Sequence, residues 1–232
     1  MRTLKYMAML AVTFCLTACG YTNHFLDEEE EEATTDTYNT LSNVTVSAYT
    51  WTYINLITGE TETHPDTSEW IYTGSGDIRE AQQAEAIGID WHVAVHRYEF
   101  KTNRASVLNT GLTDILSVTR LPDGTYTPDE TAAYETEAEK ENGYLLIMDM
   151  AGMMNGVIGY ARNPVINRVL CGAITRTATG GMPPTVYGTT NEVFVLKWTD
   201  GSWATLQITG TLHTETSVSH YMSFNYNYYS TE

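Results

Sequence analysis

The chain has 232 residues, with 12 Lys and Arg against 29 Asp and Glu, so its net charge at pH 7 is −17. A chain this acidic has no broad basic face to neutralise phosphates, which argues against nucleic-acid binding. Its length suffices for one sizeable domain with its own apolar core.

The N-terminus has the features of a lipoprotein export signal. Arg2 and Lys5 form a basic region, Met7–Leu16 is a short apolar run, and Leu-Thr-Ala-Cys ends at Cys19. This pattern predicts removal of residues 1–18 and lipidation of Cys19; the alternative is an ordinary secretory peptide. The apolar run is too short to span a membrane, so we expect a lipid anchor.

Residues 19–42 are expected to form a lipidated, acidic tether. The six consecutive acidic residues Asp27–Glu32 repel one another and cannot be buried, which favours an extended linker. An acidic block after the lipidated Cys also resembles the signal that exports Bacteroidetes lipoproteins to the outer face of the outer membrane; a plain solvated linker is the alternative. Without its leader the chain has 10 basic and 29 acidic residues, a net charge of −19. With Cys19 lipidated, Cys171 has no disulfide partner.

The mature chain reads as alternating strands. Asn43–Glu60 is rich in Val, Thr and aromatic residues and ends at a turn containing Gly59. Asp77 is placed to cap a short helix over Ile78–Gly88, with Glu80 completing a capping box. A second, weaker helical segment is expected from Pro128 to about Gly143.

Ile89–Asn103 has strand character and contains two histidines. Alternation places Trp91 with Val93, Val95 and Arg97 on one face, and His92 with Ala94, His96 and Tyr98 on the other. His92 and His96 would then lie about 13 Å apart, too far to share one metal ion. We therefore interpret His96 as a structural histidine.

Tyr144–Tyr160 (YLLIMDMAGMMNGVIGY) contains four of the methionines, Met148, Met150, Met153 and Met154. Methionine is a flexible filler of apolar cores, so a buried strand is one interpretation. A thioether is also a soft, neutral ligand for iron or Cu(I), which makes a metal site the other. The stretch alone leaves both open.

The segment around Trp91 resembles a known family. Its pattern continues from Trp91 through Val93-Ala-Val-His-Arg-Tyr98 to Phe100-Lys-Thr-Asn103, which is similar to the hallmark of the HmuY family of haem-binding surface lipoproteins. Trp51-x-Tyr53, Asn191–Lys197 and the final Met222–Tyr229 strand match further parts of that pattern. His92 and Arg104 depart from it. The resemblance implies one all-β domain of antiparallel strands over residues 43–232, with one or two short helices.

The resemblance also implies a site. In that family two loops of the C-terminal half supply the axial ligands of haem iron, which carries over to Met182 for one and to Met153 or Met154 for the other. The sequence has no His between His96 and His213, which excludes two histidines at these loops. Ile158, Tyr160 and Tyr187 are candidate pocket residues. Arg162, Arg168 and Arg176 are candidate partners for the haem propionates.

The expected function is therefore haem capture at the cell surface, with haem taken from host carrier proteins and passed to a TonB-dependent outer-membrane receptor. The lipid anchor would hold the protein on the outer membrane, facing outward. No enzyme motif is found, and catalysis is not expected. The alternatives are a Cu(I)-binding lipoprotein that uses the four clustered methionines, and an adhesion or glycan-binding β domain without haem.

Overall fold

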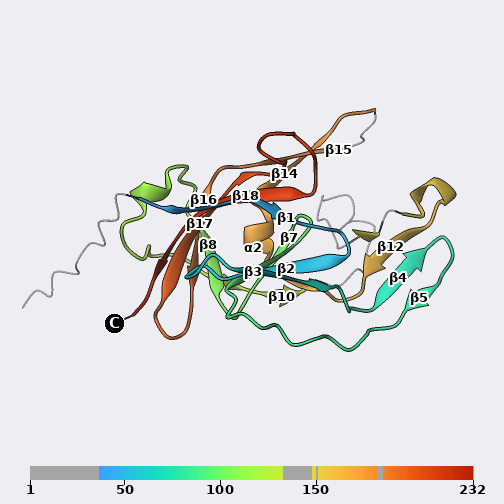
Figure 1. Cartoon of the computed structure of the whole chain (residues 1–232), viewed down its shortest axis with the longest axis horizontal. Coiled ribbons are helices and arrows are strands. Elements are labelled where there is room, and N and C mark those ends of the chain that lie inside the picture. The colour runs from blue at the N-terminus through green and yellow to red at the C-terminus, as the bar shows by residue number, and fades with distance from the viewer. Residues whose placement is uncertain (1–36, 133–147, 150, 182–184, 232) are drawn as a thin grey trace, which may run out of the picture. The chain divides into compact units, whose positions relative to one another are not determined.

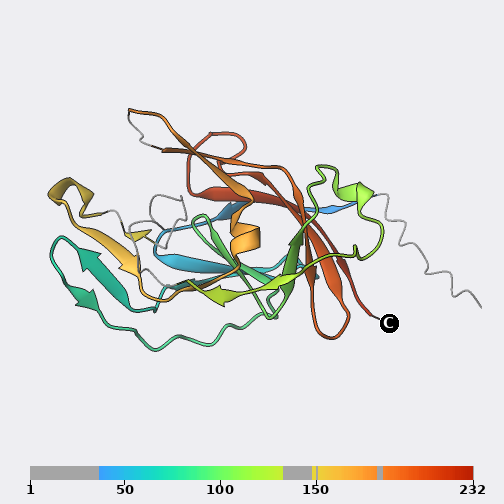
Figure 2. The ribbon, with the colours of Figure 1, turned by 180° about the vertical axis from the view of Figure 1, so that it is seen from behind.

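Antiparallel β-sheets make up most of the computed structural model, which describes residues 37–132, 148–149, 151–181 and 185–231 (Figures 1 and 2). This confirms the all-β prediction. The largest sheet has six strands, in the order β1 (Asn39–Thr45), β18 (Tyr221–Tyr229), β17 (Trp203–Gly210), β16 (Val193–Lys197), β8 (Ser106–Asn109) and β9 (Thr127–Pro128). Because β1 begins at Asn39, regular structure starts inside the segment expected to be a tether.

Two four-stranded sheets and two small pairs complete the described strands. One sheet has the order β3 (Thr61–Pro65), β2 (Thr50–Ile54), β6 (Val93–His96) and β7 (Glu99–Thr102). The other has the order β11 (Met148–Asp149), β12 (Ile158–Ala161), β4 (Trp70–Thr73) and β5 (Ile78–Arg79). The pairs are β14 (Ile174–Ala178) with β15 (Thr185–Thr189), and β10 (Glu130–Thr131) with β13 (Val165–Ile166).

One large apolar core joins the six-stranded sheet to the β3–β2–β6–β7 sheet. Strand alternation sends Phe194 and Leu196 of β16 into this core, whereas Val193 and Val195 face a smaller cluster. The short 3-10 helix η1 (Ile115–Ser117) covers that smaller cluster through Ile115. Both faces of β16 are therefore buried.

Helices are few and short in the described residues. Besides η1 they are η2 (Met153–Asn155), also 3-10, and the single α-helical turn α2 (Arg168–Cys171). No described helix is long and apolar enough to cross a bilayer. Pro128 and Glu130 lie in short strands rather than at the start of a helix, and residues 133–147 of the expected weak helix lie outside the described residues.

The helix expected over Ile78–Gly88 is wrong. Ile78 and Arg79 instead pair with β4 as β5, and the segment after them has no helical turn. Almost all of this segment is exposed, so a helix here would have no apolar face to bury. In the extended conformation the Arg79 guanidinium donates to the carbonyls of Asp66 and Ser68, at 3.1 and 3.2 Å. These tertiary contacts outweigh the local capping signal.

The expected face assignment of Trp91 and His92 is also wrong, because β6 begins only at Val93. The Trp91 ring lies 5.0 Å from the Tyr53 ring, on the face that His96 shares. His92 instead packs on the opposite side, with its ring 5.4 Å from Trp198 and 4.9 Å from Tyr228. The two histidines therefore sit in separate environments.

The Asn167 side chain connects three elements and generates a stability prediction. It is fully buried, its Oδ1 accepts from the Leu170 N–H at the start of α2, and its Nδ2 donates to the Thr127 carbonyl and to Asp129.

Asn167→Ala should lower the free energy of unfolding by about 2–4 kcal/mol, because a helix cap is lost and buried acceptors lose their donor. Urea denaturation measures this. Asn39→Ala, at an exposed position, should change it by less than about 0.5 kcal/mol.

Candidate functional site

Two loops were expected to carry iron ligands, and the structure describes one of them. Met153 and Met154 form η2 between β11 and β12, and the Met154 side chain is 88% exposed. The Met153 backbone is described but its side chain is not. Met182 follows β14 and precedes β15, and it lies outside the described residues. In Figures 1 and 2, β12 and the β14–β15 hairpin lie at the same end of the domain.

The three expected pocket residues differ in their surroundings. Tyr160 and Ile158 project from the same face of β12, where Tyr160 is 9% exposed and belongs to the large core, while Ile158 is half-buried and packs against it. Tyr187 is half-buried on β15 and stacks on Tyr98, with ring centroids 4.0 Å apart and an interplanar angle of 19°. Tyr187 lies beside charged groups.

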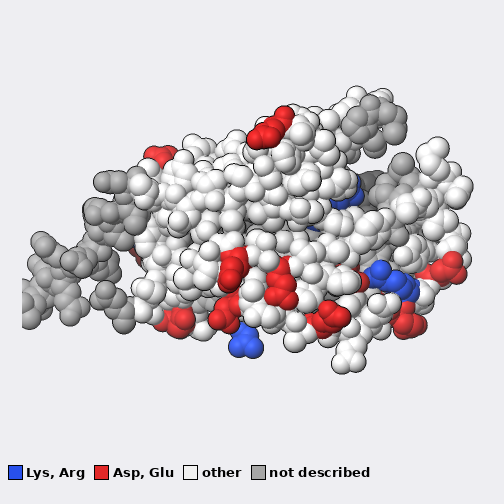
Figure 3. Space-filling view, in the orientation of Figure 1, with Lys and Arg blue, Asp and Glu red and all other residues white. Residues whose placement is uncertain are grey.

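Two guanidinium groups flank the stacked tyrosines. Arg97 occupies the turn between β6 and β7 with a left-handed φ of 56°, and its guanidinium carbon lies 5.3 Å from the centre of the Tyr98 ring and 5.8 Å from that of Tyr187. Arg176 is the direct cross-strand partner of Tyr187. With Glu99, these residues form the arginine–tyrosine cluster. Figure 3 shows basic side chains in a recess beneath the β14–β15 hairpin.

Glu99 is buried in this cluster, and its nearest ionic partner among the described residues is Arg176. Its side chain is 3% exposed, and its Oε1 lies 3.8 Å from Arg176 Nη2, beyond hydrogen-bonding distance. Burial raises the pKa of Glu99 to about 8, against the opposing effects of Arg176 and Arg97. Burial therefore disfavours the charged form of the Glu99 carboxyl, which weakens its compensation of the two arginine charges.

The Nε atoms of Arg97 and Arg176 are buried and lack hydrogen-bond partners among the described residues. Burying such donors without partners is costly, so a carboxylate entering the cluster would gain from them. A flat ring could lie against the tyrosines while its carboxylate meets a guanidinium. The cluster thus suits a planar molecule with acidic substituents.

The other two arginines considered from sequence are already paired. Arg162 Nη1 lies 2.7 Å from Glu69 Oε1, and Arg168 Nε pairs with Glu130. Arg176 is therefore the best placed of the three. Arg97 and Glu99 were not among the predicted site residues, because their contact with Tyr187 depends on long-range packing.

His, Cys, Asp and Glu side chains do not gather into a metal-binding group in the part of the chain that is described. No cluster of three or more His, Cys, Asp or Glu side chains is found there that could hold a metal ion. Cys171 is a buried free thiol whose pKa is raised to about 12 by burial and by Glu99. Its sulfur accepts from the Phe100 N–H at 3.3 Å, which anchors α2 to β7.

The raised pKa of Glu99 predicts how the stability of the fold depends on pH. The folded protein holds the Glu99 proton up to about pH 8, whereas the unfolded chain releases it near its ordinary pKa of 4.5, so the free energy of unfolding falls as pH rises between these values. Glu99→Gln should remove this fall. Between about pH 4 and pH 9 the variant should gain on the order of 5 kcal/mol relative to the wild type.

Urea denaturation across this pH range makes the comparison. The exposed Glu85→Gln variant should follow the wild type throughout. Parallel pH profiles for Glu99→Gln and the wild type would show that Glu99 is not buried in its protonated form.

Comparison with known proteins assigns the fold to a family. A sequence model of the HmuY protein family matches residues 47–226. The apo form of an HmuY analogue from Tannerella forsythia is 30% identical, with a TM-score of 0.67, over 84% of this chain and 97% of that chain. No functionally curated protein matches.

Two further solved structures share the fold. A protein described as HmuY-like and haem-binding, from Bacteroides vulgatus, is 25% identical with a TM-score of 0.60, over 82% of this chain and 90% of that one. Apo PinO from Porphyromonas gingivitis has a TM-score of 0.68 at 21% identity, over 85% of this chain and 100% of that one. The family match spans most of the chain and includes the strands that build the arginine–tyrosine cluster, so the chain belongs to the HmuY family.

Proposed function

We propose that this chain is a haem-capturing lipoprotein of the cell surface. The observation that carries the proposal is the HmuY family match over residues 47–226, in a family with haem-binding members. The arginine–tyrosine cluster adds a physical reason, because it offers a flat aromatic contact next to two guanidinium groups whose Nε atoms have no hydrogen-bond partner among the described residues. Haem is a flat macrocycle with two carboxylates.

Two methionines are the proposed axial ligands, Met182 from one loop and Met153 or Met154 from the other. Support comes from the family resemblance, from the absence of histidine between His96 and His213, and from the exposed Met154 thioether in η2. Thioethers are soft and neutral, so they favour ferrous over ferric iron more than imidazoles do. The site should therefore bind reduced haem more tightly.

The proposed setting is the outer face of the outer membrane, with the protein anchored through a lipid on Cys19. From there the chain would take haem from host carrier proteins and pass it to a TonB-dependent receptor. Exchange would follow relative affinity, since each partner shifts the bound population by mass action. No catalytic step is part of this proposal.

Haem titration followed by visible absorption tests the proposal. The purified chain should give a shifted Soret band with haem, and the shift should be larger after reduction with dithionite. Met182→Ala should weaken binding of reduced haem at least about tenfold, because an axial bond is lost, and either Met153→Ala or Met154→Ala should do the same.

Met148→Ala is the matched control, since Met148 lies in β11 and is expected to pack rather than ligate. Absence of any Soret shift under reducing conditions would rule out the haem proposal. Binding of Cu(I) without haem would favour the copper alternative. Haem binding that survives both loop substitutions would leave the function standing and refute the ligand assignment.

The propionates are proposed to contact the arginine–tyrosine cluster. Arg97→Gln and Arg176→Gln should each weaken haem binding about five- to twentyfold, because a charge-assisted hydrogen bond contributes roughly 1–2 kcal/mol. The same variants should bind haem dimethyl ester, which lacks both carboxylates, as well as the wild type does.

Arg120→Gln, at an exposed position, should bind both porphyrins normally. Equal weakening of haem and its dimethyl ester would mean that the arginines act on the fold rather than on the propionates. Difference absorption titrations with each porphyrin make the comparison.

A further inference from the structure

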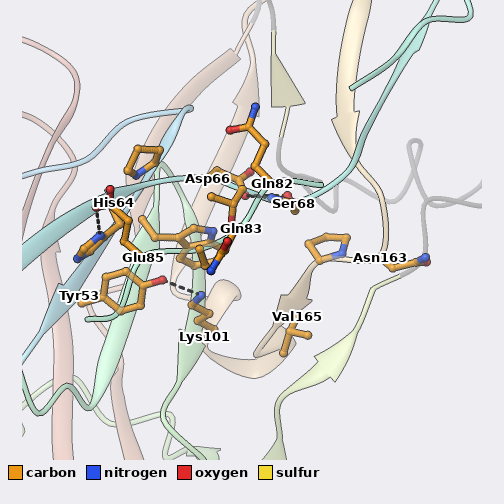
Figure 4. Close-up of a pocket in the computed structure, with 15 residues that line it drawn as sticks. Tyr53, His64, Asp66, Ser68, Gln82, Gln83, Glu85, Lys101, Asn163 and Val165 are labelled. Atoms are coloured by element: carbon orange, nitrogen blue, oxygen red, sulfur yellow. Dashed lines mark hydrogen bonds and ion pairs between the residues drawn. The ribbon is translucent and has the colours of Figure 1, made fainter. Parts of the chain in front are cut away.

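A cavity lies on the β3–β2–β6–β7 sheet, with none of the expected haem-site residues in its lining. It has a volume of about 440 Å³, within the range of small-molecule sites. Figure 4 shows Tyr53 and Lys101 facing each other on one side of it, with Asn163 and Val165 across from them and Gln82 and Asp66 above. We call this cavity the Lys101 pocket.

Strand register brings Lys101 into contact with aromatic rings. Tyr53 and Lys101 flank Ala94 in neighbouring strands, and this small residue leaves room for their side chains to meet above it. Lys101 Nζ donates to the Tyr53 hydroxyl at 3.3 Å. It also lies 4.0 Å from the centre of the Trp51 ring and 5.8 Å from that of Trp91. The ammonium group is thus held at an aromatic wall.

No carboxylate pairs with this ammonium group among the described residues, although two lie near enough to act on its pKa. Asp66 Oδ1 accepts from the amide and hydroxyl of Ser68, and its Oδ2 accepts from the Trp70 indole at 3.0 Å. Its Oδ2 also lies 3.5 Å from His96 Nε2. Asp66 is therefore already occupied, and it has no ion-pair contact with Lys101.

Asp129 is occupied in the same way. It accepts from the amide and hydroxyl of Thr102, at 2.7 and 3.0 Å, and from Asn167 Nδ2 at 3.0 Å. Burial lowers the pKa of Lys101 to about 8, and Asp66 and Asp129 offset only part of this effect. When a buried amine has no counter-ion in contact, a ligand that supplies a counter-ion binds with a favourable free energy.

The remaining ionisable groups in the lining of the pocket are His64, whose side chain is 14% exposed, and Glu85. His64 Nε2 is 2.5 Å from Glu62 Oε1, and His64 Nδ1 is 3.7 Å from Glu85 Oε2, whose side chain is 82% exposed. These acidic groups and the net charge of −17 oppose a ligand that carries several negative charges. The same groups repel an otherwise apolar ligand with a single negative charge much less.

We propose that the Lys101 pocket is a second binding site, for a small monocarboxylate with a flat ring. The carboxylate would accept from Lys101 Nζ, which keeps two donors beyond its bond to Tyr53. It would also accept from the Tyr53 hydroxyl, which accepts from Lys101 and keeps its own proton to donate. The ring would lie in the cavity beside Val165. The proposal is independent of haem binding.

Benzoate is the probe that tests it, by isothermal titration calorimetry with the intact protein. Benzoate should bind, benzamide should not bind measurably because it brings no charge, and benzene-1,3,5-tricarboxylate should bind at least tenfold more weakly than benzoate. Lys101→Met keeps the length of the side chain and should weaken benzoate binding at least tenfold. Tyr53→Phe should weaken it about threefold or more.

Lys197→Met is the matched control, because Lys197 is exposed on β16, and it should bind benzoate normally. Circular dichroism of each variant establishes that it is folded. The proposal is overturned if benzoate does not bind, if Lys101→Met binds it as the wild type does, or if benzamide binds equally well. Displacement of benzoate by haem would also overturn it, since the two sites would then be one.

Discussion

The register of the β6–β7 hairpin is the constraint on which both proposed sites depend. It pairs His96 with Glu99 and Ala94 with Lys101, so side-chain alternation sets all the ionisable members of these pairs on one face. Phe100 and Val95 occupy the opposite face and fill the core. A slip of one residue would exchange the two sets and bury charge in the apolar core, so packing fixes the register strongly.

Burial acts in opposite directions on the two charged residues of β7. It raises the pKa of Glu99 and lowers that of Lys101, which moves both groups toward their uncharged forms. They lie about 7 Å apart along the strand, one beside the arginines and the other beside the aromatic wall. This acidic protein thus has two partly buried regions that could bind a negatively charged group, one next to Glu99 and one next to Lys101.

Local sequence patterns predicted several of the strands correctly, whereas the site residues stay predictions. Alternation and aromatic content predicted β2 and β6, and the family resemblance predicted β18. The stacking of Tyr187 on Tyr98 joins positions far apart in the chain, and the role of Tyr187 as a pocket residue stays a prediction. The helix over Ile78–Gly88 failed because capping signals carry no information on whether a face can be buried. Lys101 meets Tyr53 only through the pairing of β2 and β7 with β6, which no local pattern encodes.

The pairing of β1 with β18 has a consequence for folding. Asn39 pairs with Tyr226 and Thr45 with Tyr221, so the first described strand pairs with a strand near the opposite end of the sequence. Contacts of such long sequence separation form slowly, because a large loop must close before they can stabilise the fold. The six-stranded sheet cannot be completed until β18 is available. If the chain is exported across a membrane, as we propose, such late closure would keep the polypeptide unfolded during transport.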